Sequence, residues 1–317
     1  MSSVGRVPDF FIIGHPKCGT TALHAMLKAH PQIYMPDVKE PQFFASDLRV
    51  PIPGSSPRAA PMTHEQYLAL YAPARPEQLV GDASTRYIWS ATAARRIAEA
   101  QPAARIIALL REPASFLRSL HLQLLQNRSE REPSLRRAIA LEADRREGRE
   151  LTKLAASQPQ LLMYCERARY VDQLRRYHAV FPREQVLVLV YEDFRAANEQ
   201  TVRGVQRFLG VDDSAPLQVV EANETVRRRV GIDEAMFAVT YGRGSLASVK
   251  QAIKLLTPRA VRRGAFKALQ QGVVFGEPEP PDEEFMRELR RRFKPEVEAL
   301  SEYLGRDLFA LWGYQSV

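Results

Sequence analysis

The residues best suited to chemistry lie near the N-terminus, in a short loop that holds one lysine. Positions 14–21 read GHPKCGTT. Lys17 supplies a positive charge, and Gly19 lets the backbone approach a ligand closely. The hydroxyls of Thr20 and Thr21 can donate hydrogen bonds to anionic oxygens. These residue types together predict a binding site for a phosphate-like anion.

The segments on either side of this loop are predicted to form a buried strand and a helix. Phe10 to Ile13 is an uninterrupted apolar run, which is typical of a central strand covered on both faces. After the loop, apolar side chains recur at helical spacing from Thr20 until Pro31 ends the helix. The first amides of a helix lack intrahelical partners and carry partial positive charge, so this junction favours an anion.

The spacing of the two glycines in the loop is that of the nucleotide-binding pattern G-x-x-x-x-G-K-[ST]. Gly14 and Gly19 match it, but Thr20 occupies the position of the lysine in the pattern. Lys17 lies two residues before the second glycine instead. This displacement argues against an ordinary ATPase or kinase, and a nucleotide-dependent kinase or other P-loop enzyme is the alternative function.

A second basic residue, Arg111, follows another apolar run. Ile106 to Leu110 predicts a second buried strand, and Pro113 suits the first turn of the helix after it. Arg111 can make a two-pronged contact with a phosphate, and Ser119 on the helix can add a hydroxyl. A structural ion pair is the competing interpretation of a single arginine at the end of a strand.

Strands and helices alternate as far as Gly210, which predicts an α/β fold. Polar residues 84–87 follow a predicted strand end at 79–82, where ligands gather in open α/β sheets. We expect a P-loop-like central parallel sheet flanked by helices, in a single domain over residues 1–317 with a core at about 8–210 and a helical C-terminal extension at about 211–317. A further short strand is predicted at 33–36 and a further buried strand at 185–194, and further helices are predicted at 64–71, 164–181, 203–209 and 282–304.

Several segments are predicted to lie outside this core. Residues 50–61 are rich in proline and predict a surface loop. Residues 128–149 are densely charged without a strong apolar stripe, which predicts a solvated helical excursion, with a mobile cover over the substrate as the alternative. Basic amphipathic segments at 249–256 and 259–269 could lie on an anionic membrane, but such segments more often pack on their own domain.

The composition favours anionic ligands. The chain of 317 residues has a formal net charge of +8 and a pI near 9.6, which does not separate a nucleotide, an acidic substrate, nucleic acid or a lipid surface. Cys18 and Cys165 are the only cysteines and lack the paired spacing of a metal site or disulfide framework, so we expect a reducing, cytoplasmic location. No run approaches the roughly 18 apolar residues of a membrane span.

Five segments, in order, resemble the sulfotransferases that use 3′-phosphoadenosine 5′-phosphosulfate (PAPS), in their bacterial, carbohydrate-sulfotransferase-like branch. Residues 17–21 are similar to the loop for the 5′-phosphosulfate, and 111–113 with Ser119 to the segment for the 3′-phosphate. Residues 39–44 resemble the K-E-x-x-F-F element, 81–84 the G-E-K-[ST] element and 191–193 the Y-E-D element. The likeness covers roughly residues 8–210.

The resemblance implies a reaction and a set of site residues. The protein would move a sulfuryl group to a hydroxyl or amine of a small-molecule, lipid or glycan acceptor by in-line displacement, releasing 3′-phosphoadenosine 5′-phosphate (PAP). Lys17 would stabilise charge on the leaving phosphate, and Glu40 would take the proton of the acceptor, with His121, His64 and Asp82 as the next candidates. No metal is expected. The residues implied to bind the nucleotide are Lys17, Cys18, Gly19, Thr20, Thr21, Arg111, Ser119, Tyr191 near the adenine and Arg229 closing on the 3′-phosphate.

One departure from the family pattern concerns the acceptor. The glutamate and lysine of the G-E-K-[ST] element are Asp82 and Ala83 here. In the carbohydrate enzymes that lysine faces the acidic sugar chain, so its absence argues against a heparan-like acceptor and favours a lipid, phenol or bacterial secondary metabolite. A third reading is a membrane- or nucleic-acid-binding protein; we expect no nucleic-acid partner and no stable membrane insertion, with peripheral membrane contact left open.

Overall fold

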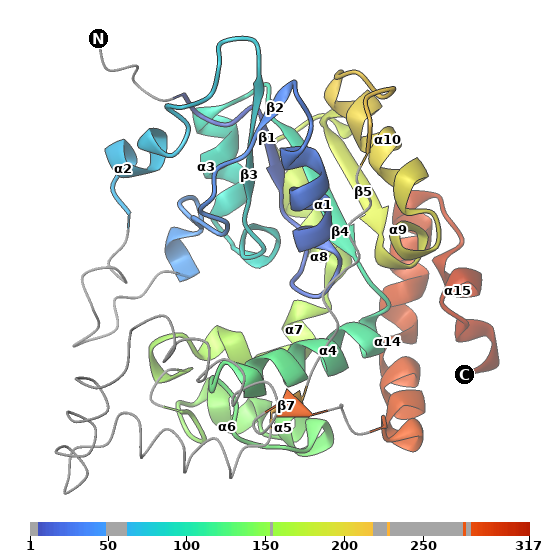
Figure 1. Ribbon diagram of the computed structural model, residues 1–317. Coiled ribbons are helices and arrows are strands. Elements are labelled where there is room, and N and C mark those ends of the chain that lie inside the picture. The colour runs from blue at the N-terminus through green and yellow to red at the C-terminus, as the bar shows by residue number, and fades with distance from the viewer. Residues whose placement is uncertain (1–5, 49–61, 153–154, 218–226, 229–274, 277–279) are drawn as a thin grey trace, which may run out of the picture.

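A sheet of five parallel strands in the order β2-β3-β1-β4-β5 forms the centre of the protein (Figure 1). The computed structural model describes residues 6–48, 62–152, 155–217, 227–228, 275–276 and 280–317. The predicted α/β fold with a parallel sheet is confirmed. The strands are β1 Phe10–Ile12, β2 Ile33–Tyr34, β3 Leu79–Ala83, β4 Arg105–Leu110 and β5 Val186–Val190.

The first strand lies in the middle of the sheet because its residues have no polar surface to expose. All three residues of β1 are buried, between β3 and β4. The chain then continues along β4, since the amide of His15 donates to the carbonyl of Leu109 at 3.2 Å. A Cβ on Gly14 would lie 2.5 Å from the Cβ of Leu109, so only glycine permits this approach. The loop that follows is thereby held against the end of β4.

Helices surround the sheet, and α4 runs past the carboxyl end of β4 (Figure 1). Helix α1 contacts α10, and α3 contacts α8. These contacts agree with the expected helical layers around the sheet. The helices up to residue 209 are α1 Thr20–Lys28, α2 His64–Ala69, α3 Ala93–Ala100, α4 Pro113–Gln126, α5 Leu135–Ala140, α6 Glu142–Arg146, α7 Tyr164–Arg167, α8 Tyr170–His178, α9 Tyr191–Ala196 and α10 Asn198–Leu209.

The C-terminal helix α14, Glu283–Leu304, packs against α4 and α8. Its first turn is capped by Asp282, whose carboxylate accepts a hydrogen bond from the amide of Phe285, and it ends at Gly305 in the left-handed conformation. These signals confirm the predicted last helix. A short helix, α15 Leu308–Leu311, follows it and leads to the buried Tyr314.

The predicted helix 164–181 is wrong in one respect, because it is divided between α7 and α8. The break falls at Ala168 and Arg169. The side-chain amide of Gln173 donates to the carbonyls of Glu166 and Arg167 at 3.3 and 3.0 Å, so carbonyls left free by the break are satisfied. Periodicity did not reveal this break because it depends on a side chain from the next helix.

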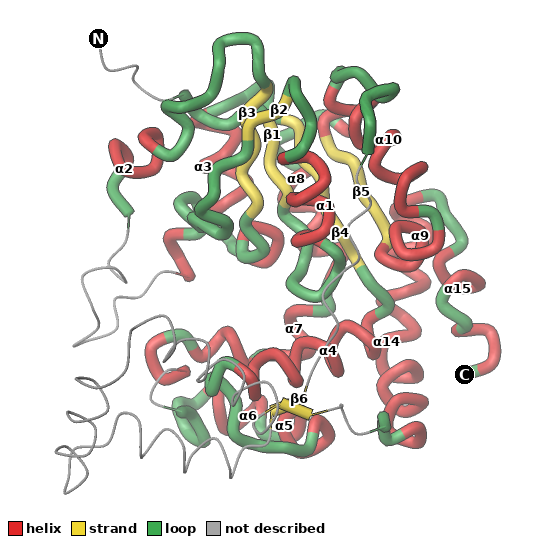
Figure 2. The backbone as a smooth tube through the Cα atoms, in the orientation of Figure 1, coloured by secondary structure: helices red, strands yellow, loops and turns green. Residues whose placement is uncertain are grey.

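Residues 128–149 are more deeply packed than the predicted solvated excursion. Ala138 and Ile139 of α5 are buried, and Arg145 of α6 forms a buried ion pair with Glu130 at 2.8 Å. Both helices lie below the sheet in Figure 2, on the same side as α4. The expected charged surface therefore hides an internal charge pair, which a count of charges cannot distinguish from an exposed one.

The buried strand predicted at 185–194 is wrong in two respects. β5 ends at Val190, and helix α9 begins at Tyr191. β5 also forms an edge of the sheet, and Leu187, Val188 and Leu189 are only partly buried. An apolar run does not distinguish a central strand from an edge strand that helices cover in part.

Two short strands in the C-terminal third were not predicted. β6, Arg227–Arg228, pairs antiparallel with β7, Phe275–Gly276. The proline-rich loop at 50–61 lies outside the described residues, as do the basic segments at 249–256 and 259–269. Among the described residues, no helix combines the length and apolar character needed to cross a membrane.

Candidate active site

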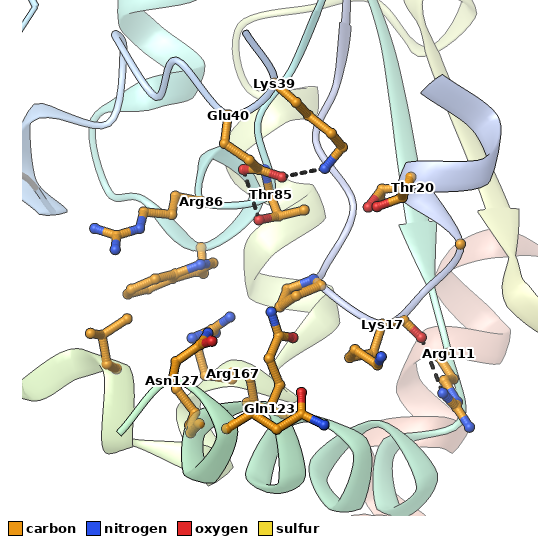
Figure 3. A pocket seen from close by; sticks show the side chains of 18 of the residues that line it. Lys17, Thr20, Lys39, Glu40, Thr85, Arg86, Arg111, Gln123, Asn127 and Arg167 are labelled. Carbon is orange, nitrogen blue, oxygen red and sulfur yellow. Dashed lines mark hydrogen bonds and ion pairs between the residues drawn. The ribbon is translucent and has the colours of Figure 1, made fainter. Parts of the chain in front are cut away.

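A cavity of about 510 Å³ lies where the carboxyl ends of the strands meet. Its walls come from the β1–α1 loop, the loops after β2 and β3, the residues directly after β4 and β5, one face of α4, and Leu161 and Arg167 at and before α7. Figure 3 shows side chains from these segments pointing into one space. The parallel sheet thus brings together segments more than a hundred residues apart.

The β1–α1 loop has the backbone form of an anion site. Lys17 and Gly19 are both left-handed, with φ of 66° and 90°. A Cβ on Gly19 would lie 2.7 Å from the ring of Phe194, so this position requires glycine. Lys17 tolerates the same region at a cost, and such strain often marks a functional site. The loop presents Thr20 and Thr21 at the free N-terminus of α1, and both line the cavity.

Arg111 holds this loop from the end of β4. Its Nη1 donates to the carbonyl of Lys17 at 3.1 Å, and its guanidinium lies 4.6 Å from the ring centre of Tyr191. Its Nε is buried and has no hydrogen-bond partner among the described residues. Burial and the neighbouring Arg111 lower the pKa of Lys17. Two cations and an unused donor at a helix N-terminus favour a bound anion.

Glu40 faces this group from the other side of the cavity (Figure 3). One carboxylate oxygen lies 2.6 Å from the ammonium of Lys39. The other accepts hydrogen bonds from the amide and hydroxyl of Thr85 at 2.7 and 3.0 Å. The Glu40 backbone is left-handed, with φ 63°, and its amide donates to the carbonyl of Ala83. The carboxylate is therefore fixed in position and still lines the cavity.

Asp82 supports the Glu40 loop from beneath. It is fully buried and accepts hydrogen bonds from the hydroxyls of Tyr67, Tyr87 and Ser84 at 2.9, 2.8 and 2.7 Å. Ser84 in turn accepts a hydrogen bond from the amide of Gln42. Burial raises the pKa of Asp82 to about 6 although the three donors oppose that shift. Asp82, at the glutamate position of the G-E-K-[ST] element, thus positions the Glu40 loop.

The C-terminal segment braces the opposite wall. The hydroxyl of Tyr314 donates to Glu112 at 2.6 Å, and the indole of Trp312 donates to Glu192 at 2.9 Å. Glu112 also caps α4 through the amides of Ala114 and Ser115. Glu112 follows Arg111 directly, and Glu192 follows Tyr191, so these contacts fix the stacked pair from behind.

Three of the predicted site residues are not among the residues that line the cavity. Cys18 is buried in the core, where burial raises the pKa of its thiol, and its side chain does not line the cavity. Ser119 is 5% exposed on α4 and is also absent from the lining. Arg229 lies outside the described residues. Lys17, Gly19, Thr20, Thr21, Glu40, Arg111 and Tyr191 are brought together.

The reserve candidates for the base also lie elsewhere. His121 is buried and hydrogen-bonds the carbonyl of Glu132, and His64 stacks on Phe43 outside the cavity. Asp82 is enclosed by its three donors. Glu40 is the one carboxylate among the described residues that line the cavity.

Several lining residues were not predicted from the sequence. Arg86 belongs to the polar segment expected after β3, but no role was assigned to it. Gln123 and Asn127 are spaced by four residues at the end of α4, which a search for polar pairs beside the apolar stripe would have found. No sequence pattern indicated a site role for Arg167, which lies within the predicted helix 164–181, and none was predicted for Trp89.

Comparison with known proteins identifies the class to which this fold and cavity belong. The chain is a member of the Sulfotransferase family, whose profile matches residues 8–215. The crystal structure of a sulfotransferase from Alicyclobacillus acidocaldarius is similar, with a TM-score of 0.66 and 26% identity, covering 96% of this chain and 98% of that one. The resemblance inferred from the sequence is confirmed.

Two human relatives show the same family over shorter regions. Carbohydrate sulfotransferase 15 of Homo sapiens is 28% identical over 151 residues, 37% of this chain and 27% of that protein. The bifunctional heparan sulfate N-deacetylase/N-sulfotransferase 3 of Homo sapiens is 27% identical over 217 residues, 65% of this chain and 22% of that protein. The matched regions make up about a quarter of these curated relatives.

Asp82→Asn is expected to remove one part of the pH dependence of stability. Because the folded pKa is about 6 and an unfolded aspartate has about 3.9, the folded protein binds this proton more tightly. Ionisation of Asp82 therefore lowers the free energy of unfolding as the pH rises between these values, by up to about 3 kcal/mol. Urea denaturation should show the difference, wild type minus variant, falling across this window and constant above it. A difference independent of pH would contradict the raised pKa.

Tyr314→Phe is expected to lower the free energy of unfolding by about 1 to 3 kcal/mol, because it removes a buried donor from a carboxylate. Urea denaturation measures this change. Tyr303→Phe is the matched control, since the Tyr303 hydroxyl contacts His178 at a less buried position. Equal losses in both variants would show that the contact with Glu112 has no special weight.

Proposed function

We propose that this protein is a sulfotransferase that moves a sulfuryl group from PAPS to a hydroxyl or amine of an acceptor. One observation carries the proposal. A hydrogen bond from the Arg111 guanidinium to the Lys17 carbonyl places two cations at the N-terminus of α1, and Glu40 lines the same cavity opposite them. Membership of the Sulfotransferase family supports it over the kinase alternative. The position of Lys17, before the second glycine of the loop, supports it as well.

The residues of the cavity fit a nucleotide with two phosphate groups. The amides at the start of α1 and the hydroxyls of Thr20 and Thr21 suit the 5′-phosphate. The unpartnered Nε of Arg111 suits the 3′-phosphate, and the ring of Tyr191 stacks beneath that guanidinium. Roles for Cys18, Ser119 and Arg229 stay predictions. When bound, PAPS would supply an activated sulfuryl group with PAP as its leaving group.

Lys17 and Glu40 have complementary parts in this proposal. Lys17 stabilises the negative charge that develops on the leaving 5′-phosphate of PAPS, and its half-buried, desolvated position strengthens that effect. Glu40 takes the proton of the accepting hydroxyl or amine as general base. The Thr85 hydrogen bonds hold one carboxylate oxygen, so movement of Lys39 would free the other for the acceptor.

The proposal includes one catalytic domain in the cytoplasm of a bacterium. α14 and the C-terminal segment pack on the core and contact Glu112 and Glu192, which supports a single domain. Both cysteines are free, which suits a reducing compartment. The names of the human relatives favour a glycan acceptor, whereas Ala83 in place of the expected lysine favours a smaller one.

PAP is expected to raise the melting temperature more than adenosine 5′-monophosphate, which lacks only the 3′-phosphate, because binding to the folded state stabilises it. Arg111→Gln should weaken AMP binding to some extent, because Arg111 also holds the Lys17 loop, and should weaken PAP binding about ten- to a hundred-fold more. Lys28→Gln, on the exposed side of α1, is the matched control. Equal stabilisation by PAP and AMP would reject the proposed nucleotide, and stabilisation by ATP with magnesium-dependent turnover would favour a kinase.

Glu40→Gln is expected to keep PAP binding while slowing sulfuryl transfer by about 10² to 10⁴-fold, the usual contribution of a general base. Transfer can be followed with labelled PAPS and a panel of hydroxylated and amino metabolites. Thr85→Val removes the hydroxyl hydrogen bond to Glu40 while keeping the shape of the Thr85 side chain, so it should give a smaller loss of transfer rate than Glu40→Gln. Turnover of Glu40→Gln near that of the wild type would place the base elsewhere.

A further inference from the structure

Arg167 is a buried cation in the cavity wall that the proposed reaction does not use. It ends α7, is 3% exposed, and lines the cavity. Its Nε has no hydrogen-bond partner, and no carboxylate of the described residues pairs with its guanidinium. The ring of Trp89, another lining residue, lies 4.1 Å from it. A buried charge without a partner costs stability, so we expect this cation to bind an anionic ligand.

The surroundings of Arg167 disfavour its charged form. Burial and the nearby Arg86 lower the pKa of Arg167 to about 9. The side chain is nevertheless held in place from its own backbone, because Gln173 donates to the Arg167 carbonyl at 3.0 Å. Gln173 is itself fixed by a hydrogen bond with His15 at 2.7 Å. The break between α7 and α8 therefore presents the guanidinium to the cavity.

The position of Arg167 separates it from the charges that suit the donor nucleotide. Figure 3 shows Arg167 beside Asn127, away from Arg111 and across the cavity from Glu40. Lys17 and Arg111 meet at the N-terminus of α1, and Lys39 is paired with Glu40. Arg167 is thus a cation on the acceptor side without a counter-charge among the described residues.

We propose that the acceptor carries an anionic group, a carboxylate or a sulfate or phosphate ester, that binds Arg167. A planar or apolar part of the acceptor lies against Trp89 and Leu161, and its accepting hydroxyl or amine faces Glu40. The proposal rests on the proposed sulfotransferase function. It favours compact amphipathic anions over neutral lipids and simple phenols as acceptors. Arg167 would supply a positive charge to the cavity, where Ala83 replaces the lysine of the family pattern.

The experiment uses the full protein saturated with PAP, so that added anions cannot occupy the nucleotide site. Benzoate and phenylacetate are titrated against their neutral counterparts benzamide and phenylacetamide by calorimetry at millimolar concentrations. The anions should bind about ten- to a hundred-fold more tightly, the range of a charge-assisted hydrogen bond. Equal binding of the charged and neutral probes, or binding of none of them, would overturn the proposal.

Arg167→Met tests the assignment to this residue. It should abolish the preference for anions without lowering the melting temperature, because methionine keeps apolar contact with Trp89 and removes an unpaired buried charge. Arg169→Met, two residues away and paired with Asp172 at the surface, should keep the preference. A preference that survives Arg167→Met would refute the assignment, and a large loss of stability would indicate a structural role instead.

Arg167→Lys provides the second variant in case the methionine variant does not fold. It keeps the charge but loses the planar fork, so the preference should fall without disappearing. If the wild-type protein does not bind PAP, the proposed function is rejected. If it binds PAP but shows no preference for the anionic probes, only this inference is rejected.

Discussion

The hydrogen bond from Arg111 to the carbonyl of Lys17 is the interaction on which the rest of the site depends. It joins the end of β4 to a loop whose backbone is left-handed at Lys17 and Gly19. That conformation costs energy for lysine, so it persists only where neighbours impose it. The Phe194 ring occupies the space where a side chain on residue 19 would lie, and the Tyr191 ring stacks on Arg111. The site is therefore preorganised before any ligand arrives.

Three acids behind the cavity, Glu112 and Asp82 buried and Glu192 partly buried, fix the residues that face it. Glu112 and Glu192 accept hydrogen bonds from Tyr314 and Trp312 and hold the stacked pair, while Asp82 accepts hydrogen bonds from the hydroxyls beneath the Glu40 loop. Each acid is supplied with donors, as low dielectric requires. A chain segment two hundred residues away in the sequence thus completes the wall of the cavity at Arg111 and Tyr191.

The sequence was sufficient for elements that depend on local pattern and insufficient for those that depend on distant partners. β1, α1, β4 and α14 follow from apolar runs and capping residues, and the anion loop followed from residue types alone. The break after Arg167 depends on Gln173, and the packing of residues 128–149 depends on the buried pair of Glu130 and Arg145, which charge counts cannot reveal. Ser119 matched a spacing, but its helix face is set by tertiary packing.

The charges of the cavity divide into two groups with different degrees of compensation. On the donor side, Lys17 and Arg111 repel each other, and a doubly phosphorylated nucleotide would remove that repulsion. On the other side, Arg167 is a buried cation without a counter-charge among the described residues, an arrangement that costs stability. Stability alone does not account for such a residue, whereas function at the expense of stability does. The same reasoning that assigns Lys17 and Arg111 to an anion therefore assigns Arg167 to a second one, on the acceptor.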